Sequence, residues 1–151
     1  MEGDNMTLEQ RVPAADIFTY LAWATAVAAT AGSLFFSEVM ELPPCVLCWY
    51  QRIAMYPQIF VIGAAIATRD IGWKKYSLPL SLVGFSIAVY HNLLYYGLID
   101  ESLAPCVQGI SCTSRQIEWF GFITIPFLSL SAFILILLFT ILSGRKKDSE
   151  K

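Results

Sequence analysis

The chain has few charged residues and little of the chemistry that soluble enzymes use. Only 15% of its 151 residues are charged and 56% are hydrophobic, and it has one histidine and four cysteines. Soluble domains are about 45–50% apolar and about 25% charged, so the composition excludes a soluble enzyme with a conventional amphipathic core. Ten Lys and Arg stand against twelve Asp and Glu. This near-balance gives neither a basic surface for nucleic acid nor the acidic excess of a disordered chain.

The charges are missing from four long stretches, which are residues 17–36, 42–68, 76–99 and 119–144. Only the second stretch contains a charge, Arg52. A helix crosses the bilayer core in about 20 residues, and none of the stretches alternates as the strands of a membrane barrel do. The sequence therefore predicts an all-α membrane protein. We expect one integral membrane domain over residues 1–151, a four-transmembrane-helix bundle with spans at about 17–36, 48–68, 77–97 and 120–142.

The positions of Lys and Arg predict the orientation of this bundle. Eight of them lie before the first stretch, between the second and third, or after the fourth, and they are Arg11, Arg69, Lys74, Lys75, Arg145, Lys146, Lys147 and Lys151. Arg115 is the only one in the opposite loops. Cytoplasmic loops carry the excess of Lys and Arg, so we expect both termini in the cytoplasm. The acidic N-terminal region has the wrong sign for a cleaved signal peptide, so we expect the first span to be retained.

All four cysteines fall on the predicted outward side. Cys45 and Cys48 form a C-x-x-C that opens the second span after two prolines, and Cys106 and Cys112 lie in the loop before the fourth span. Outside a bacterial membrane, disulfides persist. A Cys₄ zinc site and two structural disulfides are alternatives, but five residues between Cys106 and Cys112 is an unusual spacing for zinc. A C-x-x-C at a helix start favours a thiol–disulfide relay, and no metal is expected.

Two polar residues within the spans are candidates for binding an electron acceptor. Arg52 follows Cys45 and Cys48 at helical spacing, which predicts that all three share one face, and His91 lies at a similar depth in the third span. A charge within a span is costly and is a functional candidate by default, although Arg52 could instead extend to the headgroups. His91 could flank a pocket with Arg52 or bond a neighbouring helix. A lipid-soluble quinone fits such a site, and no Rossmann, haem-attachment or P-loop motif offers another acceptor.

The string C-V-L-C-W-Y-Q-R at residues 45–52 resembles the signature of the DsbB family, the bacterial thiol:quinone oxidoreductases of the cytoplasmic membrane. The resemblance continues through His91, the second cysteine pair and residues 116–126. The string F-G-F-I-T-I-P-F-L at residues 120–128 is similar to the shorter BdbC-type members of Gram-positive bacteria. The resemblance covers most of the chain.

The resemblance implies a role for each candidate residue. Cys106 and Cys112 would accept electrons from an extracytoplasmic thioredoxin-fold oxidase of the DsbA type, through a mixed disulfide at Cys106. A transient Cys45–Cys112 bond would then lead to reduction of the Cys45–Cys48 disulfide. Cys48 would contact a quinone, either ubiquinone or menaquinone, and Arg52 and His91 would help to bind it.

The same resemblance implies a place in the cell. The protein would be a multi-pass protein of the bacterial cytoplasmic membrane, in contact with lipid, with its active face extracytoplasmic, and it would support disulfide formation in exported proteins. One feature departs from the Gram-negative members, in which the second cysteine pair is much more widely spaced than Cys106 and Cys112 are here.

Two other functions stay open on the sequence. A non-catalytic membrane interaction or assembly protein would hold its cysteines as two structural disulfides. A relay similar to vitamin K epoxide reductase would share the four helices and the C-x-x-C. In that family the C-x-x-C usually lies late in the chain, whereas here it opens the second span, so the order of the elements disfavours this alternative.

Overall fold

The structure is a computed structural model that describes residues 14–69, 71–100 and 124–148. Within these ranges it contains four α-helices and no strand, and the helices are α1 (Ala14–Leu34), α2 (Val46–Thr68), α3 (Lys74–Tyr95) and α4 (Ile125–Asp148). A π-helical turn, η2 (Phe35–Val39), extends α1, and a 3₁₀ turn, η3 (Ile71–Trp73), precedes α3. Over the described residues, the prediction of an all-helical fold is confirmed. Cys106, Cys112 and Arg115 lie outside the described residues.

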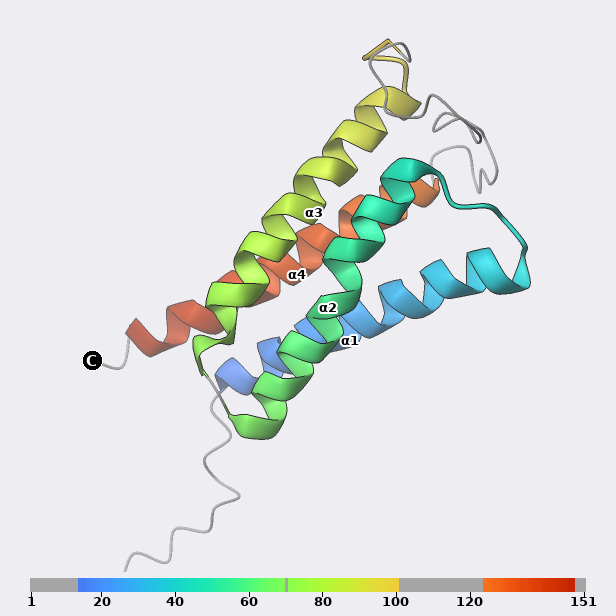
Figure 1. The fold of residues 1–151 in the computed structure, drawn as a ribbon. Coiled ribbons are helices and arrows are strands. Elements are labelled where there is room, and N and C mark those ends of the chain that lie inside the picture. The colour runs from blue at the N-terminus through green and yellow to red at the C-terminus, as the bar shows by residue number, and fades with distance from the viewer. Residues whose placement is uncertain (1–13, 70, 101–123, 149–151) are drawn as a thin grey trace, which may run out of the picture.

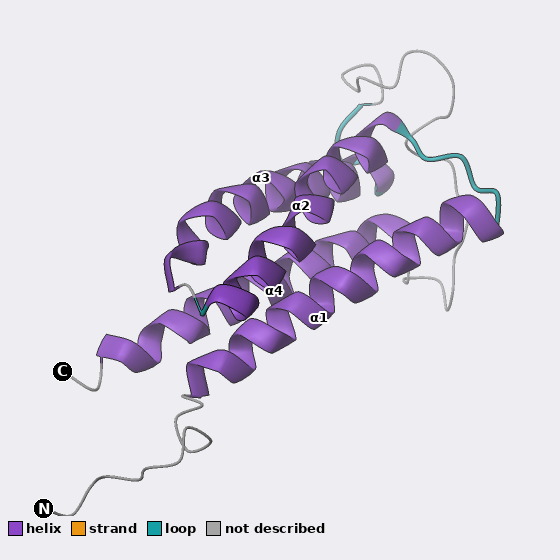
Figure 2. Cartoon of the chain, turned by 60° about the horizontal axis from the view of Figure 1, so that its bottom comes forward, coloured by secondary structure: helices purple, strands orange, loops and turns teal. Residues whose placement is uncertain are grey.

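The four helices run side by side as an antiparallel bundle (Figure 1). Each helix packs against its neighbour in the sequence, and α1 also packs against α4. The start of α1, the α2–α3 connection and the end of α4 lie at one end of the bundle, and the start of α2 lies at the other (Figure 2). The short α1–α2 and α2–α3 connections place these consecutive helices side by side in opposite directions, which is usual in such bundles.

Three helical segments are long and apolar enough to cross a membrane, and they are Ile17–Val39, Lys74–Tyr95 and Ile125–Ser143. Only 22–39% of the apolar window in each is buried inside the structure, so most of its side chains face outward, where a bilayer would cover them. With 23 residues α2 is as long, but it carries Gln51, Arg52 and Gln58. Both glutamines are buried inside the bundle. α2 is not among the three segments because its hydropathy is lower, and this lower hydropathy comes largely from the glutamines on its inner face.

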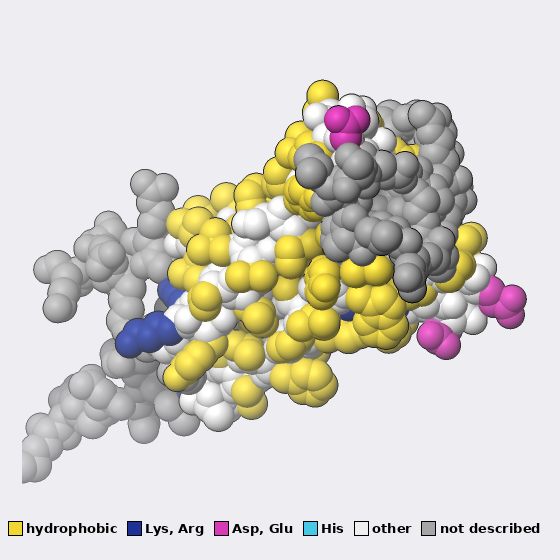
Figure 3. Space-filling view, turned by 45° about the horizontal axis from the view of Figure 1, so that its top comes forward, with side chains coloured by type: hydrophobic (Ala, Val, Ile, Leu, Met, Phe, Trp, Pro, Cys, Tyr) yellow, Lys and Arg dark blue, Asp and Glu magenta, His cyan; other side chains and the backbone are white. Residues whose placement is uncertain are grey.

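Apart from Arg52, which lies within α2, the charged side chains coloured in Figure 3 gather at the two ends of an apolar surface. Arg69, Lys74 and Lys75 lie where α2 turns into α3. Glu38 and Glu41 follow α1, and Asp100 follows α3, at the opposite end of the bundle. The predicted orientation depends on this separation, because the end that carries Lys and Arg is the one expected in the cytoplasm.

Buried polar side chains join α2 to α3 in the middle of the bundle. The Gln58 amide donates to the Ser77 carbonyl over 3.3 Å and to the Ser81 hydroxyl over 2.5 Å. The Ser77 hydroxyl in turn donates to Gln58 Oε1 over 2.6 Å. All three residues are fully buried, and every polar atom named here has a partner. Between helices in a membrane, hydrogen bonds of this kind contribute about 0.6 kcal/mol on average.

A glycine lets α3 and α4 approach closely. A Cβ added at Gly84 would lie 2.2 Å from Cε1 of Phe133, a ring that is fully buried. Any larger side chain at Gly84 must therefore move the Phe133 ring or separate the helices. Small residues at helix contacts are typical of membrane bundles, where close packing replaces the hydrophobic effect as the main attraction.

We expect Gly84→Ala to lower the stability of the folded bundle by about 1–3 kcal/mol, the usual cost of overpacking. Unfolding in mixed detergent micelles, followed by circular dichroism, measures this change. Gly32→Ala on α1 is the matched control, because a Cβ there meets nothing within 4 Å. Adding Phe133→Leu to Gly84→Ala should restore part of the loss. A Gly84→Ala protein as stable as the parent would contradict the close contact.

Candidate functional site

The C-x-x-C begins α2, as the two preceding prolines predicted. Cys45 has an extended backbone, with φ −70° and ψ 167°, and is the N-cap of the helix. Its Sγ accepts a hydrogen bond from the backbone N–H of Cys48 over 3.2 Å. Both cysteines are free thiols. The thiol of Cys45 therefore occupies the place of the usual Ser or Asp cap, at the positive end of the helix dipole.

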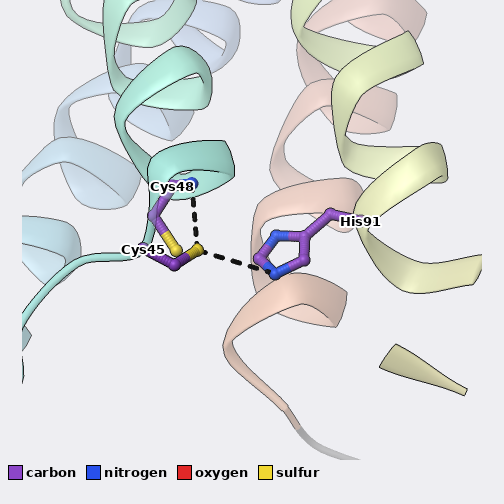
Figure 4. A group of neighbouring side chains, drawn as sticks. All are labelled: Cys45, Cys48 and His91. Carbon is purple, nitrogen blue, oxygen red and sulfur yellow. Dashed lines mark hydrogen bonds between the residues drawn. The ribbon is translucent and has the colours of Figure 1, made fainter. Parts of the chain in front are cut away.

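His91 approaches this thiol from α3 (Figure 4). Its Nε2 lies 3.8 Å from Cys45 Sγ, and its Nδ1 lies 3.2 Å from the amide nitrogen of Gln51. His91 is only 2% exposed. Because an amide N–H donates to Nδ1, the ring proton of a neutral imidazole is on Nε2, directed at the sulfur. Gln51 thus orients the ring, and His91 is placed to stabilise a thiolate at Cys45.

The charge state of Cys45 follows from these contacts. The side-chain hydrogen bond with Cys48 lowers the pKa of the Cys45 thiol from 9.0 to about 4, with hydrogen bonding and electrostatic attraction from His91 contributing and burial acting in the opposite direction. A thiolate rather than a thiol is the nucleophile in disulfide exchange. Cys45 therefore has its reactive form at neutral pH when the pair is reduced.

Cys48 also lines a cavity of about 450 Å³. The walls come from α1, the segment before α2, α2 itself and the first turns of α4, and they are mostly apolar or small side chains such as Ala28, Phe36, Leu42, Leu128 and Leu135. The largest polar side chains in the wall come from α2, and they are Gln51, Arg52 and Tyr56, whereas α1 and α4 contribute small hydroxyl residues. Cys45 and His91 do not line it. Cys48 is thus the cysteine shared between the thiol cluster and the cavity.

Arg52 is held at the cavity wall by the end of α1. Its Nη2 donates to the Ser33 carbonyl over 3.1 Å and also to the Ser37 hydroxyl. Its guanidinium lies 5.4 Å from the centre of the Trp49 ring, within the range of a cation–π contact. Nε is buried and has no hydrogen-bond partner among the described residues. The charge is therefore fixed by α1 and Trp49, with one N–H still available beside the cavity.

The structure brings Cys45, Cys48, Arg52 and His91 to one end of the bundle, but in two groups. Spacing predicted that Cys45, Cys48 and Arg52 share one face. Because Cys45 caps the helix with an extended backbone, it contacts α3, whereas Cys48 and Arg52 line the cavity. His91 likewise contacts Cys45 and Gln51 and does not line the cavity with Arg52. The positions of Cys106 and Cys112 lie outside the described residues.

Sequence reasoning missed three contributors to the site. Gln51 stands inside the C-V-L-C-W-Y-Q-R string and could have been found there. Ser33 and Ser37 are four residues apart at the end of the first span, a spacing that puts them on one face of a helix. Their partner could not be found from spacing, since it depends on how α1 packs against α2.

The thiols and the imidazole also form a possible metal-binding group. The ligand atoms of Cys45, Cys48 and His91 all lie within 4.8 Å of one another. Two thiolates and an imidazole are a ligand set that zinc accepts. The spacing of the cysteines offered only a Cys₄ site as a zinc alternative, because nothing in the spacing indicated that His91 would join the C-x-x-C.

Comparison with known proteins identifies relatives over most of the chain. The family described as "Disulfide bond formation protein DsbB" matches residues 15–143. The chain is 46% identical over 133 residues to the disulfide bond formation protein C of Bacillus subtilis (strain 168). This alignment covers 87% of this chain and 96% of that protein. It is 41% identical over 126 residues to the probable disulfide formation protein C of Halalkalibacterium halodurans, covering 83% of this chain and 92% of that protein. No solved structure gives a significant match.

The residues matched by the family include the helices of the bundle as far as Ser143, and the C-x-x-C lies among them. The free thiols, the apolar helices and the matched relatives agree on one class of protein, a bacterial membrane protein with redox-active cysteines. On this evidence the chain belongs to the DsbB family of disulfide bond formation proteins.

Proposed function

We propose that the protein is a thiol:quinone oxidoreductase, which reoxidises a thioredoxin-fold dithiol partner of the DsbA type and passes the electrons to a membrane quinone. The observation that carries this proposal is the position of Cys48, which belongs both to the thiol cluster with Cys45 and to the cavity that Arg52 lines. Electrons that leave the cysteine pair therefore have an adjacent apolar cavity in which an acceptor can bind.

The cavity suits a quinone ring in size and chemistry. Its volume of about 450 Å³ is within the usual range for small-molecule sites, and its walls are largely apolar. Quinone oxygens accept hydrogen bonds, and Arg52 supplies a buried Nε–H that has no partner among the described residues. A quinone supplies a lipid-soluble acceptor of two electrons and two protons. The head group of either ubiquinone or menaquinone has the ring oxygens that this match requires.

The relay consists of three balanced steps. The partner's two thiols are oxidised to a disulfide as the Cys106–Cys112 disulfide is reduced to two thiols, by way of a mixed disulfide at Cys106. Cys106 and Cys112 are reoxidised as the Cys45–Cys48 disulfide is reduced, through a transient Cys45–Cys112 bond. Cys45 and Cys48 then form their disulfide again and lose two electrons and two protons to the quinone.

The residues around Cys45 favour the direction of this flow. Stabilising a thiolate stabilises the reduced form of a cysteine pair, and this makes the corresponding disulfide a stronger oxidant. The Cys48 hydrogen bonds and His91 act on Cys45 in this way. We propose that His91 supports the reaction through Cys45, and that Arg52 and Cys48 contact the quinone.

The proposal places all four helices across the bacterial cytoplasmic membrane. The three apolar segments and α2 have similar lengths, and α2 turns its glutamines inward. The end of the bundle with the C-x-x-C lies opposite Arg69, Lys74 and Lys75. By the positive-inside rule, the cysteines then face the extracytoplasmic side and both termini face the cytoplasm.

Reporter fusions test this orientation. Alkaline phosphatase, which is active only when exported, should be active when fused after Met40 and inactive when fused after Arg69. A green fluorescent protein fusion, which folds in the cytoplasm, should give the opposite pattern at the same two sites. Phosphatase activity at both sites or at neither would exclude four spans in this orientation.

Cys45→Ser and Cys48→Ser should each reduce quinone-dependent oxidation of the partner dithiol by at least about 10³-fold, because each removes a reacting sulfur. The purified protein is assayed in detergent with a short-chain quinone and a reduced DsbA-type partner. Both variants should still form a trappable mixed disulfide at Cys106. Val46→Ala, between the two cysteines, is the control and should keep the parent rate. Turnover near the parent rate in either serine variant would refute the relay. Chelator in the assay should leave the rate unchanged.

The titration of Cys45 should be visible in the reduced protein by the ultraviolet absorbance of its thiolate. In a Cys106→Ser, Cys112→Ser background, this absorbance should be present at neutral pH and should disappear as the pH falls through about 4. The sign follows from a lowered pKa, since the thiolate persists above it and is protonated below it. His91→Leu should move the loss to higher pH, and Tyr50→Phe, at an exposed position of α2, should not. A thiolate that disappears near pH 8.5, the ordinary value for cysteine, would contradict the assignment.

A further inference from the structure

A tyrosine on α2 lines the same cavity as Arg52, one helical turn further from the cysteines. The hydroxyl oxygen of Tyr56 is buried and has no hydrogen-bond partner in the part of the chain that the structure describes. Buried hydroxyl groups are nearly always hydrogen-bonded in proteins, and each exception calls for an explanation. A ligand that binds in the cavity and forms a hydrogen bond with this hydroxyl is one such explanation.

Half of the buried side-chain polar atoms without a partner in the described residues belong to residues that line this cavity. Four buried side-chain polar atoms lack a partner among the described residues, and two of them, Arg52 Nε and the Tyr56 hydroxyl, belong to residues that line the cavity. The other two, on Thr30 and Asn92, belong to residues outside its lining. The remaining buried polar cluster, around Gln58, is internally satisfied. The two orphaned groups of the cavity lie on one helix, so a single ligand in the cavity can satisfy both of them.

Cys48, Arg52 and Tyr56 form a single row along α2. They are spaced at i, i+4 and i+8, and all three line the cavity. Successive members of such a row are separated by about 6 Å along the helix axis. This is close to the distance between the two oxygens on opposite sides of a quinone ring. A ring lying along the row would therefore have one oxygen at Arg52, beside Cys48, and the other at Tyr56.

We propose that Tyr56 is the second hydrogen-bond donor to the quinone, and that it holds the ring oxygen remote from the cysteines. This inference rests on the proposed function and adds to it a residue that fixes the orientation of the ring. A phenol suits both redox forms, because its O–H donates to a quinone oxygen and its oxygen accepts from a hydroquinone O–H. Arg52 has donors only. Tyr56 transfers no electrons, and its effect is on affinity for both forms of the ring.

Tyr56→Phe tests the proposal, because it removes the hydroxyl and keeps the ring that shapes the cavity. Binding of a short-chain ubiquinone and of a short-chain menaquinone is measured by quenching of tryptophan fluorescence, with the cysteines oxidised so that no electrons are transferred. We expect Kd for both quinones to rise about fivefold to tenfold, the usual effect of losing one hydrogen bond. The quinone KM should rise in parallel, whereas the rate of exchange with the dithiol partner should not change.

Tyr50→Phe is the matched control, since Tyr50 is on the same helix but is 48% exposed and does not line the cavity. If Tyr56→Phe binds quinone as tightly as the parent does, the proposed role of Tyr56 is overturned. Quinone reduction by the parent upholds the proposed function in that case. A fall in thermal stability of Tyr56→Phe without a change in Kd also overturns it, by showing a structural hydroxyl. A parent protein that binds quinone without reducing it refutes the proposed function, and the Kd ratio still decides the role of Tyr56. A parent that binds neither quinone refutes both.

Discussion

The hydrogen bond from the Cys48 N–H to the Cys45 sulfur is the interaction on which the site depends. It ends the extended segment that follows the two prolines and begins α2 with a thiol as its cap. Because the cap residue is extended and the next residues are helical, the two cysteines face different surroundings. Cys45 meets His91, and Cys48 meets the cavity. One capping bond thus separates the cysteine that we propose exchanges disulfides from the cysteine that we propose lies beside the acceptor.

The polar residues of α2 are of two kinds, and their hydrogen bonds distinguish them. Gln58 is satisfied by Ser77 and Ser81, so it joins two helices and has nothing left to offer a ligand. Arg52 and Tyr56 each keep a buried donor without a partner among the described residues. Polar groups are costly inside a membrane, so two unpartnered donors in the lining of one cavity support the proposed ligand, whereas a fully satisfied group such as Gln58 indicates a structural role.

The end of α1 has a function beyond spanning. It widens into the π-helical turn Phe35–Val39, and Ser37 in this turn and the Ser33 carbonyl before it hold the Arg52 guanidinium. Short π-helical segments are common at functional sites, where they redirect side chains without breaking the helix. These contacts from α1 hold the charge of Arg52 at the cavity wall, where we propose that a quinone oxygen binds.

Local patterns in the sequence determined the helical class, the start of α2 at the C-x-x-C and the candidates Cys45, Cys48, Arg52 and His91. Apolar runs, prolines before a cap and a short motif act through near neighbours, so the sequence alone contains them. The division of these residues between a thiol cluster and a cavity was decided only by the tertiary structure. It depends on the packing of α1 and α3 on opposite sides of α2, which brings Ser33 to Arg52 and His91 to Cys45. Spacing along one helix carries no information about the neighbouring helices. Gln51 stands within the motif, but its contact with His91 was decided by the tertiary structure, and Tyr56 became a candidate only once its hydroxyl was seen without a partner in the described residues.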